Sequence, residues 1–186
     1  MKLIFLTLIA YLMAFIGDTS TSPVKKDLVS GSQKKYNTSP IDEIEDNHFI
    51  LLILEEKLNY QTIKDQFDLN INSERSFPNR FDESKTDKEV TVSLLNDSST
   101  AFSYYLSHSK NIFLKGIIYT PQLILAKGVK VGISRTEIGK IFNCTPDSTK
   151  NQFKIYDVDG LTEVILNFNS SGNIIFIDIN TSVYVS

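Results

Sequence analysis

The apolar residues divide the chain into an apolar leader, a polar stretch and a patterned remainder. Met1-Lys2 is followed by an almost unbroken apolar run from Leu3 to Ile16, and the composition becomes polar after Gly17. This run has the length of a signal-peptide core and is shorter than the roughly 20 residues that a membrane-spanning helix needs. The sequence therefore predicts a secretory signal segment over residues 1–17 and delivery to the periplasm, the cell surface or the medium.

Two alternatives to a cleaved signal stay open. Phe15 occupies the minus-three position of a cut after Gly17, where signal peptidases prefer a small residue, so the leader could remain as a signal anchor. The other alternative is a buried N-terminal strand or helix. No cysteine lies near this boundary, so a lipid-bearing N-terminal Cys is not expected.

Residues 18–46 show no sustained apolar period. They are rich in Ser, Thr, Lys and Asp, contain Pro23 and Pro40, and end in an acidic stretch from Asp42 to Asp46. This composition is typical of a flexible, solvated linker. We therefore expect one α+β domain over 47–186, or two subunits at 47–126 and 127–186.

The first part of this domain mixes helix and strand patterns. The apolar run 49–54 is compatible with either a buried strand or a buried helix. Residues 59–68 predict a short helix, with Asn59 as N-cap and Ile63 and Phe67 on one face. Residues 70–88 predict a loop or a weak edge strand. Strand patterns follow at 89–95, 101–106 and 112–119, with a further short apolar piece at 123–126.

The last sixty residues predict a helix followed by a three-stranded meander. Ser134 and Glu137 have the spacing of a capping box. Ile138, Ile141 and Phe142 form one apolar helical stripe, and Pro146 prevents a long continuation of the helix. Strands are predicted at 153–156, 161–168 and 173–179, joined by turns at 157–160 and 169–172. The predicted fold class is α+β, with short helices packed on an antiparallel sheet.

The two parts share a weak internal echo. Ile63 and Phe67 have the same spacing as Ile138 and Phe142, and Asn111-Ile-Phe-Leu resembles Asn173-Ile-Ile-Phe. The two predicted helices are 75 residues apart, whereas the two strand segments are 62 residues apart. A tandem repeat would therefore need extra residues between helix and strand in the first copy, and the polar stretch 70–88 is the natural place for them. Chance recurrence is the alternative.

The string from Gly128 through Gly132 and Ser134 to Ile138, with the meander that follows, resembles the small α+β module of exported bacterial envelope proteins. Similar patterns occur in the small-protein-A type of outer-membrane lipoprotein and in β-lactamase-inhibitor-like proteins. The resemblance covers residues 127–180, and it implies a binding module without chemistry of its own. The chain departs from the lipoprotein type in lacking the lipid-bearing cysteine.

Composition narrows the function classes. The chain has 19 basic and 22 acidic residues, and only Lys2 lies in the leader, so the rest carries a net charge of −4. This balance disfavours binding to nucleic acid or to anionic lipid, so we expect no nucleic-acid partner, and no membrane partner unless the leader is retained. One cysteine, Cys144, rules out an internal disulfide, and two histidines leave few ligands for a metal site.

Candidate chemistry is sparse, and we predict no catalytic, cofactor-binding or metal-binding residues. Asp157-Val-Asp159-Gly160 shares features with a calcium loop but has Ile155 where a ligand is required, so we interpret it as a hairpin turn. A partner-binding sheet face is expected to include Tyr104, Tyr105, His108 and Tyr119.

Three functional hypotheses follow. The leading one is an exported, non-enzymatic binding protein that has a protein partner. The second is an inhibitor or immunity-type protein against a secreted hydrolase, suggested by the repeat. The third is a hydrolase with dispersed catalytic residues, using His108 and an acidic residue.

Overall fold

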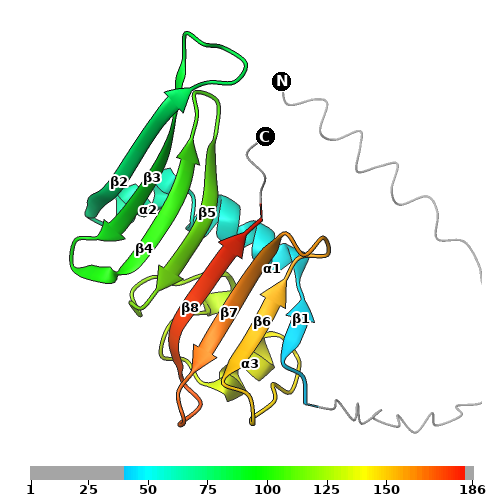
Figure 1. Cartoon of the computed structure of the whole chain (residues 1–186). Helices are drawn as coiled ribbons and strands as arrows, with labels where there is room; N and C mark the ends of the chain where they lie inside the picture. The colour runs from blue at the N-terminus through cyan, green and yellow to red at the C-terminus, as the bar shows by residue number, and fades with distance from the viewer. Residues whose placement is uncertain (1–39, 183–186) are drawn as a thin grey trace, which may run out of the picture. The chain divides into compact units, whose positions relative to one another are not determined.

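In the computed structural model, residues 40–182 form an eight-stranded sheet with short helices (Figure 1). The leader 1–17 and most of the expected linker lie outside the described residues. The elements are β1 (Glu43–Glu45), α1 (Asn47–Leu52), the π-helical turn η1 (Ile53–Lys57), α2 (Tyr60–Gln66), β2 (Leu69–Pro78), β3 (Thr86–Leu94), β4 (Asp97–Leu106), β5 (Asn111–Ile118), the 3-10 turn η2 (Ala126–Gly128), α3 (Arg135–Ile141), β6 (Gln152–Tyr156), β7 (Thr162–Phe168) and β8 (Ile174–Thr181).

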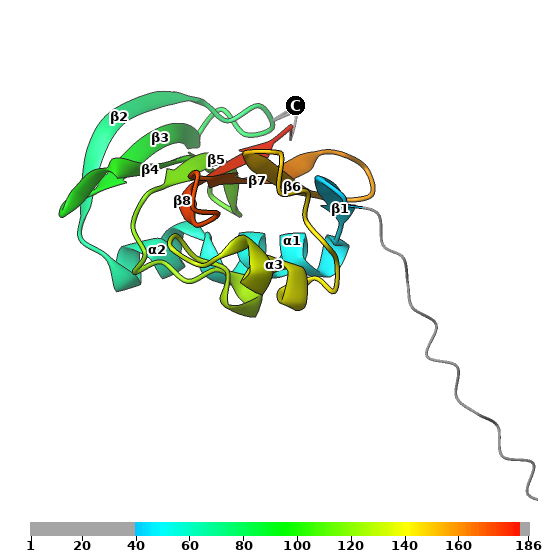
Figure 2. The same ribbon diagram turned by 90° about the horizontal axis from the view of Figure 1, so that it is seen from below.

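The strand order is β1-β6-β7-β8-β5-β4-β3-β2, and every neighbouring pair is antiparallel except β1 with β6. The helices α1, α2 and α3 all lie against one face of the sheet (Figure 2). The apolar core fills the space between the two layers, where alternate residues of each strand are buried. The predicted α+β fold class is confirmed.

Helices α2 and α3 begin at their predicted caps. Asn59 accepts a hydrogen bond from the backbone N–H of Gln61 at 2.9 Å and starts α2. Ser134 and Glu137 form the complete capping box of α3. The run 49–54, left open between strand and helix, is helical, and it buries Phe49, Ile50 and Ile53.

Two expectations need correction. The piece at 123–126, expected among the strands, is a loop leading into η2, although Leu123 and Leu125 are buried. The expected linker ends earlier than Asp46, because Glu43–Glu45 form β1 and pair with β6. Ile44 packs against the core while its acidic neighbours point away from it, so an acidic segment still supplies an edge strand.

The sheet contains two consecutive helix-then-meander units. In the first unit, α2 is followed by β2, β3, β4 and β5, which lie next to one another in that order. In the second unit, α3 is followed by β6, β7 and β8, which also lie next to one another. The last strands of the two units, β5 and β8, pair at the centre of the sheet. Each of these central strands carries a one-residue bulge, at Leu114 in β5 and at Ile175 in β8. The bulges are 61 residues apart, and the buried positions of β5 recur in β8 at the same interval. The true offset is therefore one residue shorter than the echo suggested.

The region expected to hold an insertion contains β2 and the loop 79–85. β2 is an edge strand, as one of the two sequence alternatives had it. At the opposite edge the neighbour of β6 is β1, which comes from the N-terminal side and runs parallel.

Candidate functional site: the uncovered face of the sheet

The face of the sheet opposite the helices, called the outer face below, is built from two rows of cross-strand neighbours. Between the two rows lies a buried row from Val92 to Ile44 that faces the core. Since side chains alternate along a strand, the flanking rows must point away from the helices. The first row is Thr91, Ser103, Lys115, Asn180, Glu163, Tyr156 and Glu45, and the second is Ser93, Ala101, Ile117, Asp178, Ile165, Lys154 and Glu43.

Each half of the outer face carries a hollow. The smaller one lies over β3, β4 and β5, reaches β8 across the seam and has a volume of about 260 Å³; its lining includes Thr91, Ala101, Ser103, Lys115, Ile117, Asp178 and Asn180. Small side chains in the centre of β3 and β4 create this depression.

The hollow in the second half is a larger groove of about 720 Å³. Its lining includes amides (Asn151, Gln152, Asn167), charged side chains (Asp42, Glu43, Lys150, Lys154) and apolar side chains (Ile165, Phe176). Lys154 pairs with Glu43 at 2.8 Å and lies 3.7 Å from Glu163, so much of the charge along this groove is balanced internally. The Glu43 hydrogen bond is the largest of the causes that raise the pKa of Lys154.

The two hollows contain matching polar pairs. The hydroxyls of Thr91 and Ser103 lie 3.0 Å apart, and the amide of Gln152 donates to Asn167 Oδ1 at 2.9 Å. Thr91 immediately precedes Val92, which pairs with Phe102 of β4. Gln152 immediately precedes Phe153, which pairs with Leu166 of β7. Thr91 and Gln152 therefore occupy equivalent places in β3 and β6. The two halves of the outer face are thus arranged alike and carry different side chains at equivalent places.

Of the four expected partner-binding residues, the structure places Tyr105 and Tyr119 on the outer face. Tyr119 is 40% exposed and stacks on Phe176, with ring centroids 5.2 Å apart. Tyr105 stacks on Phe77 at 5.8 Å and donates a hydrogen bond to Asp87 Oδ2. That hydrogen bond is the main reason why the pKa of Tyr105 is raised.

Tyr104 cannot contact a partner, which corrects the expectation. It alternates with Tyr105 and therefore points into the core, where it is fully buried against Tyr60 and Phe113. Burial raises the pKa of its hydroxyl above the ordinary range for tyrosine, and this hydroxyl has no hydrogen-bond partner among the described residues.

His108 lies exposed in the turn between β4 and β5. Within residues 40–182 it forms no ion pair with a carboxylate. The pairing on which the hydrolase hypothesis depended is therefore not present at this residue.

The remaining candidates have structural surroundings. Asp157 Oδ1 accepts from the backbone N–H groups of Leu161 and Thr162 inside the β6–β7 turn, and Gly160 adopts a left-handed φ of 64°. Burial raises the pKa of Cys144, which packs against the core. Among the described residues, no cluster of His, Cys, Asp or Glu could hold a metal ion, and no helix is long and apolar enough to cross a membrane.

Sequence reasoning missed three outer-face residues: Tyr156, Phe176 and Asn167. Tyr156 and Asn167 alternate with buried neighbours, so the predicted strands already contained the signal. Phe176 was hidden because Ile174 to Ile177 read as one continuous apolar run, and only the bulge at Ile175 turns Phe176 outward.

No protein-family model, curated protein or solved structure matches this chain. The resemblance to exported envelope modules therefore remains an expectation drawn from residues 127–180.

Proposed function

We propose that the chain is an exported, non-enzymatic binding protein that contacts a protein partner through the outer face of its sheet. The observation that carries this proposal is the pair of side-chain rows that crosses seven adjacent strands without any covering element among the described residues. Ser93 and Ser103 are buried, whereas the other members of the rows offer neutral polar side chains such as Thr91 and Asn180, balanced ion pairs and the ring of Tyr156, a mixture found at non-obligate interfaces.

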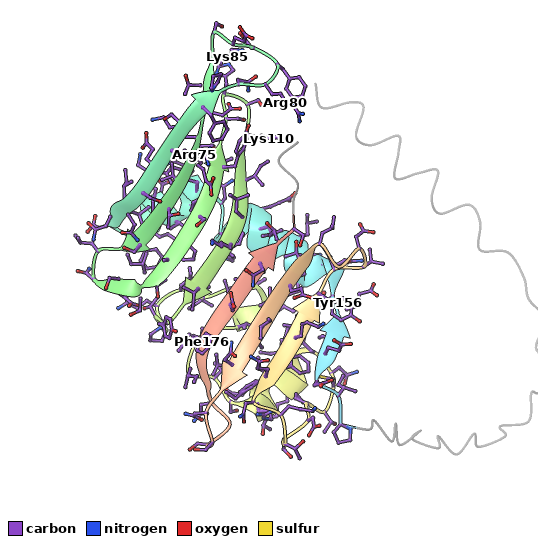
Figure 3. All side chains as sticks on the ribbon, in the orientation of Figure 1. Arg75, Arg80, Lys85, Lys110, Tyr156 and Phe176 are labelled. Carbon is purple, nitrogen blue, oxygen red and sulfur yellow. The ribbon has the colours of Figure 1, made fainter. Side chains whose placement is uncertain are left out.

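The position of the aromatic residues supports a protein partner. Tyr156 and Phe176 lie on the outer face of the second half (Figure 3), and Tyr119 adds a second ring beside Phe176. Aromatic side chains contribute large contact areas at a small cost in conformational entropy, and they are enriched where partners bind.

The proposal is tested by affinity capture of the full chain from the cells that produce it, with three variants. Phe176→Ser and Tyr156→Ser remove outer-face rings, and Leu51→Ser is the matched control because Leu51 is 51% exposed on α1, in the other layer. We expect one stoichiometric protein partner that both ring variants lose and the control keeps. Equal capture by all variants, no stoichiometric partner, or turnover abolished by one polar substitution would overturn the proposal.

A second candidate is an inhibitor or immunity-type protein against a secreted hydrolase. It is favoured by the two helix-then-meander units with their matching bulges, because the sequence suggested this function through a repeat. We expect the chain to slow nitrocefin hydrolysis by a class A β-lactamase if the target is of that kind. Unchanged hydrolysis at micromolar chain would remove that target.

A further inference from the structure

Phe81 lies in the loop 79–85 that joins β2 to β3. Its side chain is 87% exposed, the highest value among the large hydrophobic side chains of the described residues. Figure 2 shows β2 and β3 bending away from the helix layer, so the loop belongs to the same side of the molecule as the outer face. A single exposed phenylalanine is not unusual, so the surroundings of Phe81 decide its meaning.

The loop is held in one conformation by its own hydrogen bonds. Asn79 Oδ1 accepts from the backbone N–H groups of Phe81 and Asp82, both at 2.9 Å. The backbone N–H of Asn79 donates to Lys85 O, and that of Lys85 donates to Asp82 O, also at 2.9 Å. Phe81 is therefore presented on a closed, preorganised loop, which lowers the entropy lost when a partner binds.

The base of the loop is anchored to the outer face. The Asn79 side chain donates to Asp87 Oδ2 at 2.8 Å, and the same oxygen accepts from Tyr105. Asp87 is buried, and Phe77 stacks on Tyr105 beside it. These contacts connect the loop directly to the strands below it.

Unpaired cations surround the loop. Figure 3 shows Arg80, Lys85 and Lys110 at the same end of the first half, with Arg75 further along β2. Lys85 pairs with Asp82 at 3.1 Å, whereas Arg75, Arg80 and Lys110 form no ion pair within residues 40–182. The three free cations favour an acidic surface opposite the loop.

Two carboxylates on this part of the chain favour a protein partner over a membrane: Glu83 lies in the loop, and Glu89 is the cross-strand neighbour of Arg75. Glu83 and Glu89 are exposed and form no ion pair among the described residues. Uniformly anionic lipid headgroups would repel them, while a protein surface can place complementary charges opposite each one. The mixture therefore favours a protein partner.

The loop is specific to the first half of the fold. Between α3 and β6 the second half has no strand, and the edge position next to β6 is taken by β1. β2 and the loop 79–85 therefore have no counterpart in the second half of the fold.

We infer that Phe81 and Arg80 anchor the protein partner: Phe81 enters an apolar pocket of that partner, and a carboxylate on the rim of the pocket pairs with Arg80. This inference rests on the proposed function and adds the chemistry of the partner. Aromatic and arginine side chains at the centre of an interface supply most of its binding energy.

The test uses a random phage-displayed 12-residue peptide library selected on the full chain, followed by fluorescence anisotropy of the enriched peptides. We expect peptides that combine apolar residues with Asp or Glu. Phe81→Ser should weaken their binding by at least about tenfold, and Arg80→Ser should weaken it severalfold. Val158→Ser is the matched control, because Val158 is 63% exposed in the β6–β7 turn, and it should leave binding unchanged.

Several results of the peptide and vesicle experiments would overturn the inference. Peptides without acidic residues, peptides that bind Phe81→Ser as tightly as the unchanged chain, or the absence of enrichment overturn the inference. Peptides lost only in Phe176→Ser overturn the anchor role of the loop and leave the proposed outer-face function standing. Flotation with phosphatidylglycerol vesicles that Phe81→Ser abolishes would assign the loop to a lipid surface and also overturn the inference.

Discussion

Tyr104 and Tyr105 show how neighbouring residues of the same type acquire opposite roles. Tyr104 has a buried hydroxyl without a partner among the described residues, and Tyr105 donates to the buried carboxylate of Asp87. A buried polar group without a partner costs free energy, whereas a satisfied hydrogen bond to a carboxylate contributes to stability. The two hydroxyls should therefore affect folding with opposite sign.

We expect Tyr104→Phe to leave the free energy of unfolding unchanged or to raise it by up to about 1 kcal/mol, and Tyr105→Phe to lower it by about 1–2 kcal/mol. Urea denaturation followed by far-UV circular dichroism measures both values. The two variants are controls for each other, since each removes one oxygen from the same strand. Equal losses in both would contradict the assignment of Tyr104.

Asp46 links the start of α1 to η2. Its carboxylate accepts from the backbone N–H of Phe49 at 2.9 Å and forms an ion pair with Lys127. Burial raises the pKa of Asp46, but the contacts with Lys127 and Phe49 outweigh it, so the pKa lies below the ordinary value of 3.8. A lowered pKa stabilises the fold above the unfolded-state pKa, and this contribution is lost as the pH falls through the folded-state value.

We therefore expect Asp46→Asn to be less stable than the unchanged chain at pH 7 and the difference to shrink as the pH is lowered below 3.8. Thermal unfolding between pH 7 and pH 2.5 measures this difference. Asp159→Asn, in the exposed β6–β7 turn, provides the control and should show no such convergence. A difference that is constant across the range would mean that the charge of Asp46 has no stabilising role.

Among the elements, α3 is the one whose beginning the local sequence specifies most completely. Ser134 Oγ accepts from the backbone N–H of Glu137 at 3.2 Å, and the Ser134 N–H donates to Glu137 Oε2 at 2.8 Å. The backbone N–H of Ile174 also donates to Ile133 O, so the start of α3 is tied to β8. The cap therefore positions a helix and also holds it against the sheet.

We expect Ser134→Ala to lower the free energy of unfolding by about 1 kcal/mol. Ser134→Thr keeps the hydroxyl and should recover most of the loss, and Thr136→Ala is the control at an exposed position of the same helix. Chemical denaturation of the three variants decides between the outcomes. Since alanine has the higher intrinsic helix propensity, Thr136→Ala should not lower the stability, and a loss as large as that of Ser134→Ala would show that the effect is not specific to the cap.

For the whole molecule, the pairing of β5 with β8 joins the two helix-then-meander units into one sheet and one core. Gly116 pairs with Ile179 at this seam. A Cβ atom at Gly116 would lie 2.7 Å from the Phe102 ring, so the glycine is required by the close approach of core side chains. Damage at the seam should therefore reach both halves.

We expect Ile179→Ala to destabilise the protein by about 2–5 kcal/mol and to speed amide hydrogen exchange in β3 and β4 as well as in β6 and β7. Mass spectrometry of peptic fragments measures the exchange. Ile175→Ala, at the exposed bulge of the same strand, is the control with little expected effect. Faster exchange confined to the second half would show that the two units unfold separately.

Features that depend on short-range chemistry can be predicted from the order of the amino acids alone. The caps at Asn59 and Ser134 follow from the hydrogen-bonding needs of the helix backbone. The strands predicted at 153–156, 161–168 and 173–179 follow from period-two burial and correspond to β6, β7 and β8.

The face that each strand presents, and therefore the location of the candidate site, depends on how distant segments pair. Tyr104 and Tyr105 were indistinguishable in sequence because alternation fixes their opposition but not its sign. The bulges at Leu114 and Ile175 reverse the inside–outside pattern within β5 and β8, and the acidic segment Glu43–Glu45 became a strand only because β6 offers it an edge. These outcomes depend on pairing between distant residues, which local patterns do not encode.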